Sequence, residues 1–124
     1  MRLAEYDTLR ATDVHHWWYA VLRSLVERTL AGRRGHLLDA GCGTGGMLES
    51  LRSQTSVTGI DISEQAVSYC HQRGLHMVEL GCVESLPFAD ETFDVVLSLD
   101  VLYHAQVNEK RALAEMCRVL RPEG

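Results

Sequence analysis

Short apolar runs alternate along this chain with segments whose apolar residues recur every three or four positions. The runs suit β-strands, which we expect at residues 36–40, 57–61, 76–80 and 93–99. The periodic segments suit amphipathic helices, which we expect at residues 14–30, 44–53, 64–73 and 109–120. The last strand contains the uninterrupted run Val95-Val96-Leu97, which is typical of parallel strands buried on both faces. This alternation predicts an α/β fold with a parallel sheet.

Residues that favour helix ends flank the periodic segments. The expected caps are Thr12 or Asp13, Ser63 and Asn108, and the expected stops are Gly32, Gly74 and the Arg121-Pro122 pair. The spacing predicts an apolar face on each helix, formed by Val14, Trp17, Trp18, Val21, Leu22, Leu25, Val26 and Leu30 on the first, by Met47, Leu48 and Leu51 on the second, by Ala66, Val67 and Cys70 on the third, and by Ala112, Leu113, Met116, Cys117 and Leu120 on the last.

Trp17 and Trp18 allow two interpretations. Their place on the apolar face of the first helix favours packing against the sheet. Alternatively, Trp18 or Tyr19 forms part of a lid over a ligand, where an aromatic face can attract a cation such as a sulfonium.

The organising segment is residues 37–46, Leu-Leu-Asp-Ala-Gly-Cys-Gly-Thr-Gly-Gly. A short strand ends here in a glycine-rich turn that opens a helix, whose first N–H groups can meet a ligand. Glycines allow positive φ and remove the Cβ atoms that would hold a ligand away, which indicates the ligand-binding end of a strand–loop–helix unit. The spacing fits both the dinucleotide pattern G-x-G-x-x-G and the pattern G-x-G-x-G. Asp61, which ends the next strand, suits a ribose, and Asp39, two residues before Gly41, can face a cation.

Composition limits the class of protein. With 124 residues, 46% of them hydrophobic and 23% charged, the chain suits one globular domain. The net charge of −5 argues against a nucleic-acid surface. Four cysteines without a C-x-x-C pair favour free thiols in a reducing compartment, and we expect no metal site. No apolar run approaches a membrane span, so we expect a cytoplasmic location and no membrane partner.

Residues 37–46 resemble motif I of the class I S-adenosylmethionine-dependent methyltransferases. Residues 84–94, Glu-Ser-Leu-Pro-Phe-Ala-Asp-Glu-Thr-Phe-Asp, are similar to the acid-x-Leu-Pro-Phe…Phe-Asp segment of that family. Residues 118–124, Arg-Val-Leu-Arg-Pro-Glu-Gly, resemble its Arg-Val-Leu-Lys-Pro-Gly-Gly turn, and residues 16–19, His-Trp-Trp-Tyr, look like the opening of some small-molecule members. Dinucleotide dehydrogenases do not carry this set.

The resemblance implies a Rossmann-like, doubly wound parallel sheet in a single domain, with an N-terminal helical lid region over residues 1–35 and the core over residues 36–124. It implies S-adenosylmethionine as cofactor and S-adenosylhomocysteine as product. For the methionine part of the cofactor it implies contacts, mainly through backbone, with Asp39, Ala40, Gly41 and Gly43. For the adenosyl part it implies Asp61 at the ribose, Ile62 at the adenine, and Cys82 and Val83 near the adenine through backbone. It places Leu99 over the sulfonium. Cys82 stands where the family often has an aspartate, and a thiol is a poor acceptor.

Methyl transfer from a sulfonium is an in-line displacement, so the protein mainly aligns the nucleophile and the methyl group and sometimes removes a proton. His104, shortly after residues 93–99, is the candidate catalytic base, and its ordinary pKa of about 6.5 suits that task. Alternatively, His104 only lines the pocket. We expect a small-molecule methyl acceptor.

Domains of this family continue past the last turn with three more strands, which the sequence does not contain. Residues 93–99 would then leave an open apolar edge, which favours pairing with another chain. We therefore expect either a fragment of a longer protein or a homo-oligomer or partner chain that covers this edge. The alternative function is a non-catalytic cofactor-binding module or pseudoenzyme that acts through such a partner.

Overall fold

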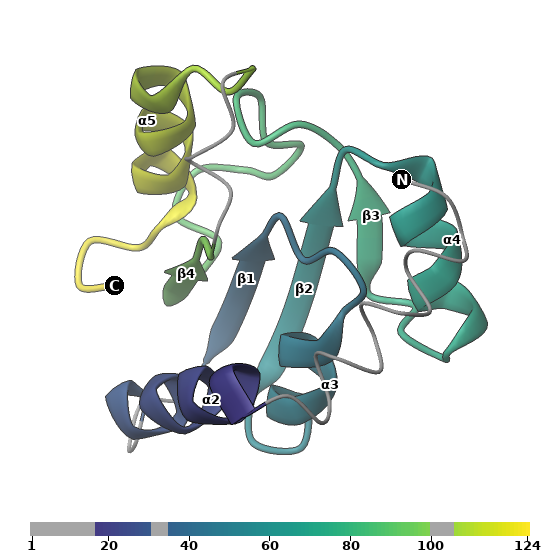
Figure 1. The fold of residues 1–124 in the computed structure, drawn as a ribbon. Helices are drawn as coiled ribbons and strands as arrows, with labels where there is room; N and C mark the ends of the chain where they lie inside the picture. The colour runs from purple at the N-terminus through teal and green to yellow at the C-terminus, as the bar shows by residue number, and fades with distance from the viewer. Residues whose placement is uncertain (1–16, 31–34, 100–105) are drawn as a thin grey trace.

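The structure is a computed structural model that describes residues 17–30, 35–99 and 106–124, with residues 17–19 in backbone only. Its strands are β1 (His36–Ala40), β2 (Ser56–Asp61), β3 (Val78–Leu80) and β4 (Val95–Leu97), and its helices are α2 (Trp17–Thr29), α3 (Gly46–Leu51), α4 (Glu64–Gln72) and α5 (Glu109–Val119). These strands form one parallel sheet in the spatial order β3-β2-β1-β4 (Figure 1). The predicted α/β fold with a parallel sheet is confirmed.

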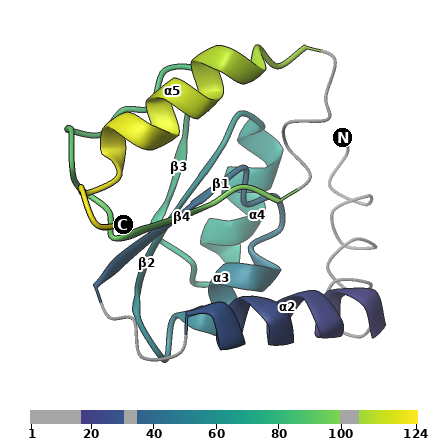
Figure 2. The ribbon, with the colours of Figure 1, turned by 90° about the vertical axis from the view of Figure 1, so that its left-hand side faces the viewer.

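Helices cover both faces of this sheet. One core cluster joins the sheet to α2, α3 and α4, and a second joins it to α5. Figure 2 shows α5 on one side of the strands and α2 with α3 on the other. Leu37 belongs to the first cluster and Leu38 to the second, because successive side chains of a strand point to opposite faces. The sheet is therefore doubly wound, as predicted.

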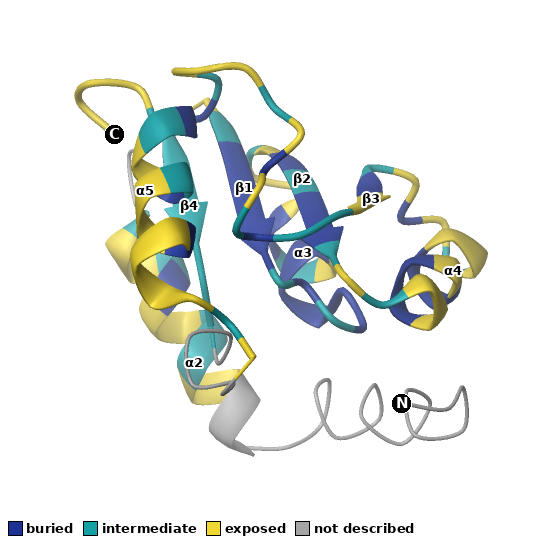
Figure 3. Cartoon of the chain, turned by 90° about the horizontal axis from the view of Figure 1, so that it is seen from above, coloured by how far each residue is buried: buried dark blue, intermediate teal, exposed yellow. Residues whose placement is uncertain are grey.

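Burial follows these layers. Figure 3, which looks down on the carboxyl ends of the strands, shows the buried positions on β1 and β2 and exposed positions on the outer side of α5. A Cβ atom at Gly59 in β2 would lie 2.5 Å from Leu48 Cδ1 and 2.9 Å from Cys42 Sγ. The absence of a side chain at Gly59 therefore lets α3 and the loop before it pack directly on the strand.

Some element bounds differ from the prediction. The bounds of β1 are as predicted, but β3 begins at Val78 instead of residue 76, and α3 begins at Gly46 because Gly45 takes a left-handed conformation with φ of 81°. β4 covers residues 95–97 instead of 93–99. Phe93 pairs with the C-terminal segment instead, since its N–H donates to the carbonyl of Val119 at 2.9 Å.

The predicted inner face of α5 was partly wrong. Leu113 is 48% exposed and Cys117 is also exposed, whereas Ala112, Met116 and Val119 are buried. The buried stripe follows every third or fourth residue from Ala112, and Leu113 and Cys117 each lie one position, or about 100°, away from it. The face predicted for α2 shows the same shift, because Val21 and Leu25 are exposed while Val26 is buried.

Several sequence predictions concern parts that the structure does not describe. The cap at Thr12 or Asp13 and the stop at Gly32 lie outside the described residues, as do the side chains of Trp17 and Trp18. Among the described strands, β4 has a neighbour only on its β1 side, and its residues are half-buried. Coverage of this edge by a second copy or a partner chain stays a prediction. None of the described helices has the length and apolar character that crossing a membrane requires.

The observed register of α5 gives a stability prediction. Met116→Ala should lower the free energy of unfolding by about 2–4 kcal/mol, because it opens a cavity between α5 and the sheet. Leu113→Ala, on the same helix, should lower it by less than about 1 kcal/mol, because the Leu113 side chain already lies partly in solvent. Urea denaturation followed by circular dichroism measures both values. Equal losses would mean that α5 presents a different face to the sheet.

Candidate functional site

The glycine-rich turn after β1 is hydrogen-bonded to the end of β2. The N–H groups of Gly41 and Cys42 both donate to the carbonyl of Ile60, at 2.8 and 3.0 Å. The N–H of Gly45 then donates to the carbonyl of Cys42 at 3.0 Å. Residues 41–45, which we call the glycine loop, thus form a tight turn directly beside the carboxyl end of β2.

Asp61, the last residue of β2, connects this loop to its neighbours. One carboxylate oxygen accepts a hydrogen bond from the N–H of Gly43 at 2.9 Å, and the other accepts from the N–H of Ser63 at 2.9 Å. The backbone carbonyl of Asp61 accepts from the N–H of Gly81, which follows β3, at 3.0 Å. The carboxyl ends of β1, β2 and β3 therefore meet at Asp61, as the strand-end argument predicted.

The loop and Asp61 leave room for a ligand. Gly43 has a φ of +54°, and a Cβ atom at this position would meet no atom within 4 Å. Ile62, the next residue after Asp61, is 74% exposed. A carboxylate offers about four lone-pair sites, so each Asp61 oxygen can accept a further hydrogen bond beside the backbone N–H that it already holds. This arrangement fits an adenosyl group, with its ribose at Asp61 and its adenine beside Ile62.

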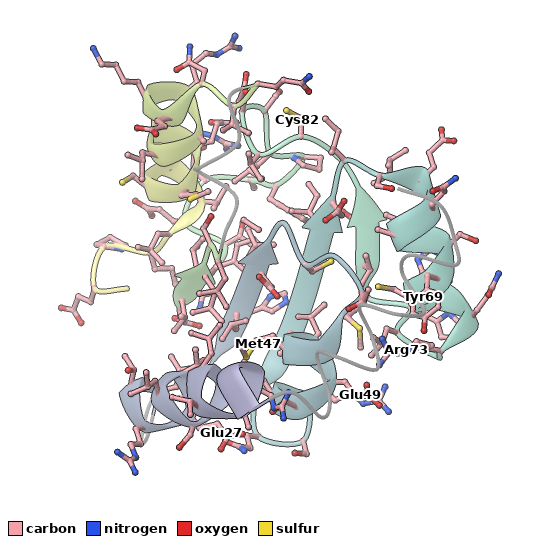
Figure 4. All side chains as sticks on the ribbon, viewed as in Figure 1. Glu27, Met47, Glu49, Tyr69, Arg73 and Cys82 are labelled. Atoms are coloured by element: carbon pink, nitrogen blue, oxygen red, sulfur yellow. The ribbon has the colours of Figure 1, made fainter. Side chains whose placement is uncertain are left out.

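Helix α4 supports the glycine loop from behind. The Cys70 thiol donates to the carbonyl of Gly43 at 3.3 Å, and the Arg73 guanidinium donates to the carbonyl of Thr44 and pairs with Glu49 of α3. Arg73 lies 5.6 Å from the centre of the Tyr69 ring, and Figure 4 shows it between Tyr69 and Glu49. Sequence reasoning missed Arg73, because a basic residue at a helix end carries no sign of the carbonyl that it will contact.

The residues predicted for the methionine end lie in the middle of the sheet. Asp39 is 3% exposed and Ala40 is fully buried, and Asp39 lies between Gly59 of β2 and Leu97 of β4 in the strand register. A ligand above the strand ends would therefore reach Asp39 and Ala40 chiefly through backbone atoms, and their contact with the cofactor stays a prediction.

Apart from the exposed Ile62, the residues predicted near the adenine and the sulfonium are buried or half-buried. Val83 is buried in the core cluster on the α5 side, so its side chain is not free to meet a ligand. Cys82 lies on the segment that leaves β3 towards α5 (Figure 4), and its carbonyl accepts from the N–H of Ser85 at 3.1 Å. Leu99 packs partly buried against the opposite cluster. His104 lies outside the described residues, so its catalytic role stays a prediction.

A pair of charged residues on α5 holds the segment that follows Cys82. Arg118 donates to the carbonyls of Leu86 and Phe88, at 3.0 and 2.8 Å, and pairs with Asp90 at 2.7 Å. Glu115 accepts from the N–H of Leu86 at 2.8 Å and from Arg118 at 2.6 Å. These contacts fix residues 86–90 on α5, and nothing in the sequence beyond the charges indicated them.

The comparisons with known proteins point to one family. A family model described as a methyltransferase domain matches residues 38–124. The phthiotriol/phenolphthiotriol dimycocerosates methyltransferase of Mycobacterium tuberculosis is 38% identical over 109 residues, which cover 82% of this chain and 39% of that protein. The probable tRNA methyltransferase 9B of Mus musculus is 38% identical over 88 residues, which cover 69% of this chain and 19% of that protein. The chain thus spans well under half the length of these relatives.

A solved structure supports the fold. A putative S-adenosyl-L-methionine-dependent methyltransferase from Methanococcus maripaludis superposes on this chain with a TM-score of 0.78 at 17% identity, and the match covers 96% of this chain and 59% of that one. The Rossmann-like fold that the resemblance implied is therefore confirmed.

The contacts of Glu115 predict a pH dependence of stability. The hydrogen bond from Arg118, together with that from the Leu86 N–H, lowers the pKa of the Glu115 carboxyl below its ordinary value of 4.5. A carboxyl group whose pKa is lower in the folded than in the unfolded chain stabilises the fold at pH values above its pKa in the unfolded chain. This stabilisation is lost as the pH falls through the pKa in the folded chain. Glu115→Gln should therefore reduce the loss of stability between pH 6 and pH 3. This interval spans the titration of carboxyl groups, whose unperturbed pKa values are about 4.

Thermal unfolding at several pH values measures this effect, with Glu123→Gln, an exposed position beyond α5, as the control. A Glu115→Gln profile that runs parallel to that of the unaltered chain would contradict the prediction.

Proposed function

This chain belongs to the methyltransferase domain family, and we propose that it binds S-adenosylmethionine at the carboxyl ends of β1 and β2 and transfers the methyl group to a small-molecule acceptor. The observation that carries the proposal is the contact between Asp61 and the N–H of Gly43. It brings a carboxylate that suits a ribose next to a loop that suits the methionine part.

The residues of the chain bind and orient the ligand. Asp61 accepts hydrogen bonds from the ribose hydroxyls, Ile62 packs on the adenine, and the backbone of residues 39–43 lies along the methionine part. When bound, S-adenosylmethionine supplies an activated methyl group. Holding this group in line with a nucleophile lowers the barrier by several kcal/mol, because the loss of translational and rotational freedom has already occurred on binding.

The acceptor is the least constrained part of the proposal. The relatives from Mycobacterium tuberculosis and mouse are each 38% identical to this chain, over 109 and 88 residues, and their names refer to a dimycocerosate and to a tRNA. The net charge of −5 favours the small molecule, since a nucleic-acid surface gains its affinity mainly from lysine and arginine contacts with phosphates. We further propose a cytoplasmic location, in keeping with four free thiols in the sequence.

The alternative, a non-catalytic module that holds the cofactor, is favoured by Cys82. Its thiol is a poor acceptor for an adenine amino group, and its carbonyl is already bonded to the N–H of Ser85. Incubation with S-adenosylmethionine and a panel of metabolites, followed by measurement of S-adenosylhomocysteine, separates the two. Binding without turnover over the panel would favour the module.

Two glycines provide a matched test of the binding loop. Gly43 and Gly74 both have positive φ, and a Cβ atom at either position would meet nothing within 4 Å. Alanine at either position should therefore cost a similar backbone strain, about 1–2 kcal/mol of stability. Only Gly43→Ala should also weaken the binding of S-adenosylhomocysteine, because its methyl group enters the space reserved for the ligand.

Calorimetric titration of both glycine variants measures the difference. Equal affinities for Gly43→Ala and Gly74→Ala would place the ligand away from the glycine loop and overturn the proposed site.

Asp61 gives a second test. Asp61→Ala should weaken the binding of S-adenosylhomocysteine by about 1–3 kcal/mol, because charge-assisted hydrogen bonds to the ribose are lost. Glu79→Ala, on the neighbouring strand β3, removes an exposed carboxylate and changes the net charge by the same amount. It should leave the affinity unchanged. Thermal unfolding of both variants establishes that they are folded at the titration temperature. An unchanged affinity of Asp61→Ala would mean that the ribose binds elsewhere.

A further inference from the structure

Two thiols meet beneath the glycine loop. Cys42 in the loop is 9% exposed, and Cys70 in α4 is completely buried. Both sulfur atoms belong to the same core cluster, where each affects the pKa of the other, and Cys70 Sγ donates to the carbonyl of Gly43, the residue next to Cys42, at 3.3 Å. The Cys70 thiol thus connects α4 to the backbone of the loop beside Cys42. The proposed binding of the cofactor uses neither thiol.

The surroundings give the two sulfur atoms different character. The hydrogen bond from Cys42 and the nearby Arg73 guanidinium lower the pKa of Cys70, against the opposing effect of burial. The pKa of Cys42 is raised, because Cys42 shares its proton with Cys70, is buried, and faces Asp39 and Asp61. Of the two thiols, Cys70, beside the Arg73 guanidinium, therefore loses its proton more readily than Cys42.

We propose that Cys42 and Cys70 form an intramolecular disulfide when the protein meets a peroxide, and that this disulfide closes the glycine loop to the cofactor. The first half concerns a modification site and stands on the position of both thiols in one core cluster beneath the glycine loop, with Cys70 bonded to the carbonyl next to Cys42. The second half rests on the proposed function, since it assumes that the cofactor binds at this loop.

The chemistry requires a peroxide and no other reactant. The Cys70 thiolate attacks one peroxide oxygen, an S–O bond forms as the O–O bond breaks, the other oxygen leaves as hydroxide, and Cys70 becomes a sulfenic acid. The Cys42 sulfur then attacks the Cys70 sulfur, the S–O bond breaks, and the hydroxyl group leaves as water with the proton of Cys42. The two thiols are oxidised by two electrons in total, and the peroxide is reduced to water and hydroxide.

The disulfide must change the shape of the loop. A disulfide holds its sulfur atoms about 2.05 Å apart, which is shorter than any hydrogen-bonded contact between thiols. Cys42 therefore has to move towards α4, and Cys70 loses the proton that it donates to Gly43. Because Cys42 lies between Gly41 and Gly43, this movement disturbs the part of the loop that faces the ligand. A small oxidant reaches the thiols only when the loop opens, so their oxidation is slower than that of the exposed Cys117.

Mass spectrometry tests the modification site. Trypsin places Cys42 in residues 35–52 and Cys70 in residues 53–73, whereas Cys82 and Cys117 fall in other peptides. After treatment of the chain with hydrogen peroxide, alkylation and digestion without reductant, we expect residues 35–52 joined to 53–73, and the joined pair should disappear with dithiothreitol. Cys117→Ser should retain the pair, and Cys42→Ser should lose it. Oxidation of Cys82 or Cys117 alone, with Cys42 and Cys70 still alkylated, would overturn the proposal.

Calorimetric titration tests the consequence for binding. The oxidised chain should bind S-adenosylhomocysteine about tenfold more weakly or worse, a change within the range typical of coupled sites, and dithiothreitol should restore the affinity. The affinity of Cys42→Ser should not respond to peroxide, provided that circular dichroism shows this variant folded; Cys70→Ser serves as the second such variant. Equal affinity of the reduced and the disulfide-bonded chain would overturn the effect on the loop. Failure of the reduced chain to bind would instead overturn the proposed function, while the peptide masses still decide whether the disulfide forms.

Discussion

The hydrogen bonds of Asp61 are the contacts on which the carboxyl edge of this sheet depends. The side chain holds the glycine loop through Gly43 and the start of α4 through Ser63, and the backbone carbonyl holds the exit from β3 through Gly81. Bonds from backbone N–H groups to a carboxylate are stronger than those between neutral groups. The negative charge also lies at the N-terminus of α4, where the helix dipole favours it. One residue thus fixes three segments that leave three strands.

The segments that Asp61 joins need further support, because loops rich in glycine have little side-chain packing of their own. For the glycine loop this support comes from α4, through the thiol of Cys70 and the guanidinium of Arg73. For the segment after Cys82 it comes from α5, where Arg118 bonds to backbone carbonyls and Glu115 to a backbone N–H. Helices on opposite faces of the sheet therefore shape the two sides of the same edge.

The sequence was informative where geometry follows from local pattern. The bounds of β1 and the meeting of Asp61 with the glycine loop were predictable, because parallel strands present their carboxyl ends at one edge. Contacts between distant segments were not. Phe93 looks like part of a strand by composition, yet its backbone pairs with the segment after α5. Arg73 and Arg118 were indistinguishable from other surface charges, since no periodicity reveals which carbonyl a guanidinium will reach. Leu113 fitted the apolar face of its helix and lies outside, because the buried stripe is narrower than the apolar one.

A second carboxylate shows why Asp61 suits a ligand. Asp94 lies at the amino ends of the strands, directly before β4. It accepts hydrogen bonds from the N–H of His36 at 2.8 Å and from Arg121 at 2.7 Å, and these bonds lower its pKa. A Cβ atom at Gly35 would overlap the Asp94 carboxylate, so the chain is closed tightly around it. The ion pairs between described residues include Asp94 but not Asp61. The charge of Asp94 is neutralised by an arginine and serves to fasten the C-terminal segment. Asp61 bonds to neutral backbone donors, so its charge and its outer lone pairs remain available to a further donor, such as the ribose hydroxyl groups of the ligand that we propose.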